Sequence, residues 1–407
     1  MKSKELYQQI LGIEYPWEVT GVELSLEDEE VLVKVEYVSN TAKCPECGRE
    51  CSIYDHRRER RWRHLDTCQL KTFIVCSVPR INCTKHGVLS IEVPWSESHS
   101  RFTVLFERLA IDMLLIFKKQ KRVGELLRIS FDQIHRIMKR AVERGLSRRD
   151  LSDDIRYIGI DEKSYRCGHS YITVLTDIDK KRVLGLIEGR QKSSALSLIR
   201  DTLDARQREG VKAVCMDMWR PYINATRECL KSADIVHDRF HLMKYLNNAV
   251  DSVRREEMRV ISIKERKILK GSRYIFLKNK EKWTDKQRTR FQQIRDINLK
   301  TSQAWLVKEN FREYFNSQSI NDAKFFFTEW VHNAKETGLR PIIEVVNLFI
   351  KHTSGIINYV IHKITNSISE TMNSIIQEII FTARGFKRYE NLKTAILFFL
   401  GGLSLYP

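Results

Sequence analysis

The order of short apolar segments between Ile155 and Asp238 constrains the fold of this chain more than any other feature. Five of these segments have the length and composition of β-strands, at residues 155–160, 171–175, 182–187, 211–216 and 235–236. An amphipathic helix at 193–208 separates the third from the fourth, and a helix opened by Pro221 separates the fourth from the fifth. This order predicts a ribonuclease-H-like α/β core, whose first part we assign to residues 151–245.

Two carboxylates stand where strands of this core are expected to end. Asp161 follows the first strand and Asp217 follows the fourth. These strands are neighbours in a sheet of this order, so the two carboxylates should face one another. A buried carboxylate is costly unless it is paired or binds a metal, and hard oxygen ligands suit Mg²⁺ or Mn²⁺. The alternative, for either residue alone, is a helix cap at a strand end.

A third carboxylate is expected from a helix beside the sheet. The segment 367–384 has helical spacing, and Glu370 lies in its first turn. We choose Glu370 as the third member of the set. Glu162 is a rival that points away if Asp161 points inward, and Glu378 lies two turns further along the helix.

A cysteine cluster marks the N-terminal region. Six of the nine cysteines lie between Cys44 and Cys83, and two pairs share a two-residue gap followed by glycine: Cys44-Pro-Glu-Cys47-Gly and Cys83-Thr-Lys-His86-Gly. Such turns let four ligands converge on one tetrahedral ion, so we predict one structural Zn²⁺ held by Cys44, Cys47, Cys83 and His86. Cys51 is the best substitute ligand, and reduced core cysteines are the alternative.

The rest of residues 1–95 has the pattern of a small β domain. Alternating apolar residues predict one β-hairpin from 17–24 and 31–38 and another from 62–65 and 73–78. Cys68 and Cys76 are expected to be strand residues in its core. This region is the predicted N-terminal zinc-binding β domain.

The charge balance points to a polyanionic partner. The chain has 407 residues with 70 Lys and Arg against 52 Asp and Glu, a net charge of +18. An excess of that size favours nucleic acid. Between the two cysteine pairs, Arg57, Arg58, Arg60 and Arg61 are candidate phosphate contacts, because the guanidinium fork matches a phosphate group. The alternative is a solvated charged face.

Residues 100–150 fit a helix-turn-helix DNA-binding domain. The first helix should end near Leu127, with Ser130 as the N-cap of the second. Ile134 and Ile137 should then pack inward. The face left for a groove of double-stranded DNA consists of Asp132, Gln133, His135, Arg136, Lys139 and Arg140, and all of these except Asp132 are candidate DNA contacts. An ordinary pair of amphipathic basic helices is the alternative.

The C-terminal half is almost entirely helical in pattern. We expect an all-helical insertion at 246–360, followed by the C-terminal helices of the core at 361–407. Trp283, Trp305 and Trp330 of the insertion are candidate base-stacking residues, although core positions are favoured. The expected fold class is therefore multidomain α+β, with the core interrupted by the insertion. The longest apolar stretch is too short to span a bilayer, so a cytoplasmic protein is expected.

Four motifs, together with the glutamate segment Asn366-Ser367-Ile-Ser-Glu370, closely resemble those of the ISL3-type insertion-sequence transposases. The motifs are Ile160-Asp-Glu-Lys-Ser, Gly168-His-Ser-Tyr-Ile-Thr-Val-Leu-Thr-Asp, Met216-Asp-Met-Trp-Arg-Pro-Tyr222 and Asp238-Arg-Phe-His-Leu-Met-Lys244. They occur in order, and the resemblance covers nearly the whole chain.

The resemblance implies a DDE transposase with Asp161, Asp217 and Glu370 as its metal-binding triad. Such an enzyme cleaves DNA and transfers strands with two Mg²⁺ or Mn²⁺ ions. Asp238 and His241 match a short signature of several transposase families, which implies an auxiliary or structural role. The implied partners are the terminal inverted repeats and the target DNA, bound by a homodimer or higher homo-oligomer in the nucleoid of a bacterial cell.

Two other functions remain open at this point. One is a zinc-containing DNA-binding regulator with an inactive ribonuclease-H-like core. The other is a nuclease that nicks DNA without strand transfer. Metal-dependent cleavage of an end duplex, and joining of its 3′ end to target DNA, separate the three.

Overall fold

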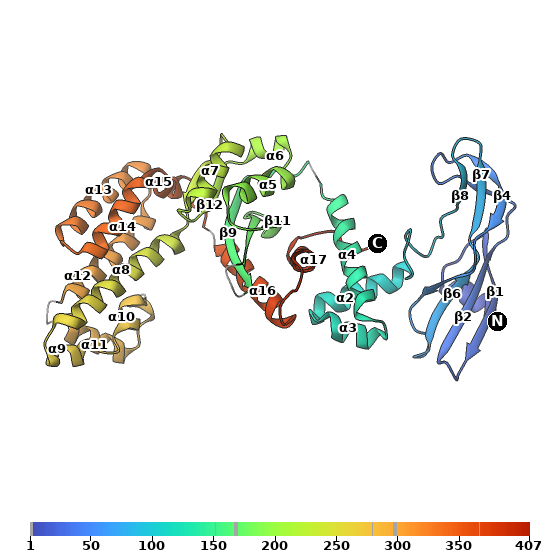
Figure 1. Ribbon diagram of the computed structural model, residues 1–407, viewed down its shortest axis with the longest axis horizontal. Helices are drawn as coiled ribbons and strands as arrows, with labels where there is room; N and C mark the ends of the chain where they lie inside the picture. Colours follow the sequence, from blue (N-terminus) through green and yellow to red (C-terminus); the bar gives the residue numbers. More distant parts are fainter. Residues whose placement is uncertain (1–2, 151, 167–169, 279, 296–298, 366) are drawn as a thin grey trace. The chain divides into compact units, whose positions relative to one another are not determined.

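The computed structural model describes residues 3–150, 152–166, 170–278, 280–295, 299–365 and 367–407 (Figure 1). Gly168, His169 and Asn366, which belong to the motifs above, lie outside the described residues. The chain is a mixed α+β protein with two compact units, Met1–Arg149 with Leu403–Pro407, and Asp150–Gly402. No helix in the described ranges combines the length and apolarity needed to cross a membrane.

The first unit begins with helix α1 (Ser3–Ile10) and two four-stranded sheets, ordered β1-β2-β6-β5 and β3-β4-β7-β8. The strands are β1 (Trp17–Ser25), β2 (Glu30–Tyr37), β3 (Thr41–Lys43), β4 (Glu50–His56), β5 (Arg60–Arg63), β6 (Lys71–Cys76), β7 (Pro79–Cys83) and β8 (Gly87–Ser90). Both predicted pairings, β1 with β2 and β5 with β6, are confirmed as antiparallel. Their alternating apolar residues, including Val33, Trp62 and Ile74, form one core.

The two cysteines predicted to lie in core strands, Cys68 and Cys76, differ in position. Cys76 ends β6 and is buried, as predicted. The prediction for Cys68 is wrong, because Cys68 is exposed and lies in the turn before β6. Both Cys68 and Gln69 adopt positive φ values, 50° and 68°, which a strand does not allow.

Three helices complete the first unit: α2 (Val104–Phe117), α3 (Gln120–Leu127) and α4 (Phe131–Ser147). As predicted, Ser130 is the N-cap of α4, and its side chain and that of Gln133 form a reciprocal capping box. Ile134 and Ile137 are fully buried, also as predicted.

The second unit contains a five-stranded sheet of order β11-β10-β9-β12-β13. The strands are β9 (Tyr157–Arg166), β10 (Ser170–Asp177), β11 (Arg182–Glu188), β12 (Ala213–Met216) and β13 (Asp234–His237). The first three pair antiparallel, whereas β12 runs parallel to both β9 and β13. The predicted adjacency of the first and fourth strands is therefore confirmed.

Two details of this unit differ from the prediction. Strand β9 does not end at Asp161, because pairing with β10 extends it through Arg166. The single helix expected at 193–208 is two helices, α5 (Lys192–Thr202) and α6 (Ala205–Gly210), because Asp204 accepts a hydrogen bond from the Gln207 amide and begins a new helix.

Helices cover both faces of this sheet (Figure 1). Helix α5 and helix α7 (Arg220–Cys229) share a buried apolar cluster with β9 and β12. Helix α16 (Ser367–Thr382) contacts β9 from the other face, where the Ser369 hydroxyl lies 3.0 Å from that of Thr176. Helix α17 (Tyr389–Leu400) lies against β11, and the Tyr389 hydroxyl donates to the Leu186 carbonyl.

A long helical segment leaves the sheet after β13 and returns to it. Its helices are α8 (Arg239–Val260), α9 (Ile263–Leu269), α10 (Arg273–Leu277), α11 (Asp285–Arg295), α12 (Lys300–Glu313), α13 (Ile320–Glu336), α14 (Arg340–Lys351) and α15 (Thr353–His362), with short 3₁₀ turns η1 (Lys280–Lys282) and η2 (Tyr314–Asn316). Trp305 and Trp330 are buried in its core, and Trp283 stacks on Trp305, which confirms the favoured core positions. Helix α15 contacts β13, where the Asn358 side chain donates to the Ile235 carbonyl.

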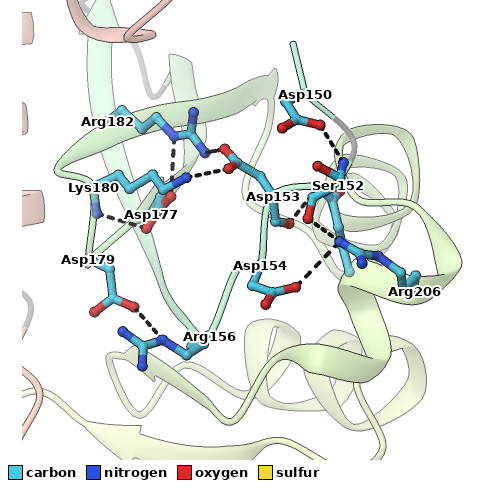
Figure 2. Close-up of polar contacts among 11 residues, drawn as sticks. Asp150, Ser152, Asp153, Asp154, Arg156, Asp177, Asp179, Lys180, Arg182 and Arg206 are labelled. Carbon is cyan, nitrogen blue, oxygen red and sulfur yellow. Dashed lines mark hydrogen bonds and ion pairs between the residues drawn. The ribbon is translucent and has the colours of Figure 1, made fainter.

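Ion pairs hold the segment that leads into β9 (Figure 2). Asp153 pairs with Lys180 and with Arg182, whose guanidinium also pairs with buried Asp177 at 3.2 Å. Asp154 pairs with Arg206 of α6. These contacts fix the start of β9, the strand that carries Asp161.

Candidate functional site

The register of the sheet brings three carboxylates level with one another. Strand β12 pairs with β9 so that Cys215 lies opposite Gly159, and with β13 so that Met216 lies opposite His237. Two residues beyond the Cys215–Gly159 pair, the same register sets Asp217 beside Asp161. One residue beyond the Met216–His237 pair, it sets Asp217 beside Asp238. Residues level in adjacent strands point to the same face, so the three side chains share one edge and one face of the sheet.

Asp161 is held by two hydrogen bonds. Its Oδ1 accepts from the Glu162 amide at 2.8 Å, and its Oδ2 accepts from the side-chain amide of Asn373 at 2.7 Å. Burial raises the pKa of Asp161 above its usual value, against the opposing effect of the Glu162 amide. Sequence reasoning missed Asn373. The sequence feature that could have identified Asn373 is its position one turn after Glu370, on the same face of α16.

Glu370 lies in the first turn of α16 and reaches the same group of charges. Its pKa is raised by burial and then by Asp238 and Asp161, so the three carboxylates interact. Both rivals lie elsewhere. Glu378 is exposed further along α16, and Glu162 points to the opposite face of β9, where its carboxylate lies 3.5 Å from the Arg190 guanidinium.

His241 connects Asp217 to the rest of the group. Its Nδ1 lies 3.4 Å from Asp217 Oδ2, while Asp217 Oδ1 accepts from the Met218 amide at 2.6 Å. Asp238 occupies the N-cap position of α8, is 1% exposed, and makes no side-chain cap hydrogen bond.

The donor set suits hard divalent cations. Asp161, Asp217 and Glu370 offer only oxygen ligands, with Asp238 and His241 beside them. Their ligand atoms are more widely spread than those of a single closed site, since the described residues contain only one group with three or more ligand atoms all within 4.8 Å, the cysteine–histidine group.

The cysteine–histidine group has the dimensions of a zinc site. The sulfurs of Cys47 and Cys83 are 3.8 Å apart, and His86 Nδ1 lies 3.6 Å from the Cys44 sulfur and 3.7 Å from that of Cys83. Tetrahedral Zn²⁺ with Zn–S bonds of about 2.3 Å places two sulfurs about 3.8 Å apart. These four residues therefore fit the ion as predicted.

Backbone amides prepare two of the thiols for a metal. The Lys85 and His86 amides lower the pKa of Cys83 to about 6. Burial alone would raise the pKa of Cys44, but the Cys47 and Glu46 amides outweigh it and lower that pKa. Such turns favour thiolates, which are the metal-binding form.

The candidate DNA contacts differ in how freely their charges face solvent. Arg57, Arg58, Arg60 and Arg61 are all exposed. On α4, Arg136 and Lys139 are also exposed, and His135 is half-buried.

Two other predicted contacts on α4 have structural partners. Gln133 is engaged in the capping box, and Arg140 pairs with buried Glu107 at 3.2 Å. Lys139 also pairs with Glu143, at 3.7 Å, but this ion pair is exposed, so Arg136 and Lys139 keep the most accessible charges among the predicted contacts on this helix.

Two family models match parts of this chain. A family model described as a transposase, of the ISL3 type, matches residues 158–396. A second, described as the zinc-finger of transposases IS204/IS1001/IS1096/IS1165, matches residues 40–86, which include all four zinc-ligand candidates. The transposase for insertion sequence element IS1557 of Mycobacterium tuberculosis is 26% identical over 99% of this chain and 96% of that protein. The transposase for insertion sequence element IS1001 of Bordetella parapertussis is 24% identical over 87% of this chain and 88% of that protein.

Proposed function

The chain belongs to the ISL3 family of transposases, and from this premise we propose that it binds the ends of its insertion sequence and catalyses metal-dependent DNA cleavage and strand transfer. The row formed by Asp161, Asp217 and Asp238 at one sheet edge, with Glu370 beside it, is the observation that carries the proposal. The strand order β11-β10-β9-β12-β13 supports a ribonuclease-H-like core, into which the helical segment 246–360 is inserted.

Asp161, Asp217 and Glu370 would hold two Mg²⁺ or Mn²⁺ ions. Bound there, the ions would activate a water or DNA 3′-hydroxyl and neutralise the leaving oxygen of the phosphodiester. Asn373 keeps the Asp161 carboxylate in one orientation through their 2.7 Å hydrogen bond, and His241 does the same for Asp217. This fixed geometry avoids reorganisation of the carboxylates during the reaction.

DNA recognition is assigned to the first unit. The zinc site would stabilise the β region, and Arg136 and Lys139 of α4 would contact the DNA. A helix capped by Ser130 and exposing basic residues suits a groove, whereas exposed arginines between the cysteine pairs suit phosphates. Because two ends must be brought together, we propose a homodimer or higher homo-oligomer on DNA in the bacterial nucleoid.

The test is incubation of the purified protein with DNA that carries the ends of its element, in Mg²⁺ or Mn²⁺, with products mapped at nucleotide resolution. Cleavage at the ends followed by joining to a target is expected. Asp161→Ala and Glu370→Ala should each slow cleavage at least about 100-fold while DNA binding is kept. Glu378→Ala is the matched control on α16. Binding without cleavage would indicate a regulator, and nicking without joining would indicate a nuclease.

A further inference from the structure

A pocket of about 370 Å³ lies on the α5–α7 side of the sheet, the face opposite to the one that carries the three carboxylates. It is lined by Tyr171, Gly189, Arg190, Gln191, Lys192, Trp219 and Pro221. Its volume is at the lower end of the range for small-ligand pockets, roughly 300–1,000 Å³. Neither the metal-holding residues nor the predicted DNA contacts use it.

The chain itself connects this pocket to the proposed metal site. Trp219 follows Asp217 by two residues, a span of at most about 7 Å. Glu162 follows Asp161 directly, and its carboxylate pairs with Arg190 of the pocket at 3.5 Å. A nucleotide next to a phosphodiester held at the carboxylates would therefore have to cross the carboxyl end of β12 to reach Trp219.

The aromatic surface of the pocket is held in place. The Trp219 indole donates a hydrogen bond to the Arg190 carbonyl at 3.2 Å, yet the side chain stays 41% exposed. The Arg190 guanidinium lies 4.2 Å from the centre of the Tyr171 ring and 5.4 Å from that of Trp219. An exposed tryptophan fixed by its own hydrogen bond presents a flat apolar face at little cost in conformational entropy.

We infer that this pocket receives one unpaired nucleobase of the DNA next to the cleaved phosphodiester, stacked on Trp219. Planar aromatic and guanidinium groups bind every base through its π face, and no specific base is required. The inference rests on the proposed function and deepens it, because a base drawn out of the duplex would admit the strand to the sheet edge.

The test uses the full-length protein, Mg²⁺ and a duplex that carries the end of its element. A series of the same duplex lacks one base at each position near the cleaved bond. Trp219→Ala should cut the intact duplex roughly 5- to 150-fold more slowly, the range for one lost base–aromatic stack. One abasic position should restore most of that loss, since no base then has to leave the stack. Trp219→Phe should keep most of the activity, and Phe381→Ala, which removes an exposed ring of α16, should match the wild type.

Two results would overturn the inference while leaving the proposed function intact. One is wild-type cleavage by Trp219→Ala, and the other is an equal loss on every abasic duplex. If the wild-type protein cuts no duplex, the proposed function fails instead. In that case, the inference is tested by the fluorescence of 2-aminopurine, placed in turn at each position of a duplex bound by the wild-type protein or by Trp219→Ala. Its fluorescence must differ between wild type and Trp219→Ala at one position, and equality at all positions refutes it.

Discussion

His237 should make the sheet of the second unit sensitive to acid. It ends the edge strand β13, is 3% exposed, and its ring lies 5.0 Å from that of His352. Burial, reinforced by His352, lowers the pKa of His237 to about 4. The folded protein therefore keeps this ring neutral at pH values where the unfolded chain, with an ordinary pKa of about 6.5, takes up a proton.

The sign and size of the effect follow from these two pKa values. Because the folded-state pKa is the lower one, stability is fully present above about pH 6.5 and falls as the pH drops toward 4. The contribution of His237 is close to zero at pH 7, about −2 kcal/mol at pH 5, and about −3 kcal/mol below pH 4.

Hydrogen exchange of the peptides that contain β12 and β13 measures this directly. The opening free energy of wild type should fall by about 2 kcal/mol more between pH 7 and pH 5 than that of His237→Phe, which keeps a ring but cannot titrate. His332→Phe, which removes an exposed histidine, is the control and should follow the wild type. The reasoning is refuted if wild type and His237→Phe lose the same amount.

Three further outcomes are expected. Elemental analysis should find one Zn²⁺ per chain, reduced in Cys44→Ser, and zinc content unchanged by that substitution would contradict the assigned ligands. Gly355→Ala should destabilise the second unit by about 1–3 kcal/mol in a denaturant titration, because the added Cβ would lie 2.6 Å from the Nε2 of buried His237. Gly210→Ala is the control and should not destabilise it, because no atom lies within 4 Å of the Cβ added there. Arg136→Ala and Lys139→Ala should each weaken binding to end DNA and reduce its salt dependence by about one phosphate contact, and an unchanged salt slope would remove them from the interface.

The sequence predicted the neighbouring strands and the zinc group because both depend on local pattern. Short apolar runs mark β9 and β12, and two-residue gaps mark the knuckles of Cys44 and Cys83. The end of β9 was mispredicted for a physical reason. The residues after Asp161 are polar, so only pairing with β10 keeps them in the strand.

Contacts between segments that are distant in the sequence could not be predicted from local sequence patterns. The bond from Asn373 to Asp161 exists only because α16 docks on β9. Likewise, Arg140 resembles a DNA contact in sequence, but Glu107 of another helix holds it. The pocket at Trp219 arises where the loop after β12 meets the one after β11, and no spacing in the sequence signals it. The domain boundaries and the roles of the site residues remain predictions.

The most direct test of the central claim, that these carboxylates hold the catalytic metal, is the metal dependence of cleavage by Asp217→Cys. A thiolate is a poor ligand for Mg²⁺ and a better one for the softer Mn²⁺. End-DNA cleavage by Asp217→Cys should therefore be lost in Mg²⁺ and partly restored in Mn²⁺, while Asp217→Ala stays inactive in both and both variants bind DNA like wild type. Cleavage by Asp217→Ala at the wild-type rate, or failure of Mn²⁺ to distinguish the cysteine from the alanine variant, would contradict the claim.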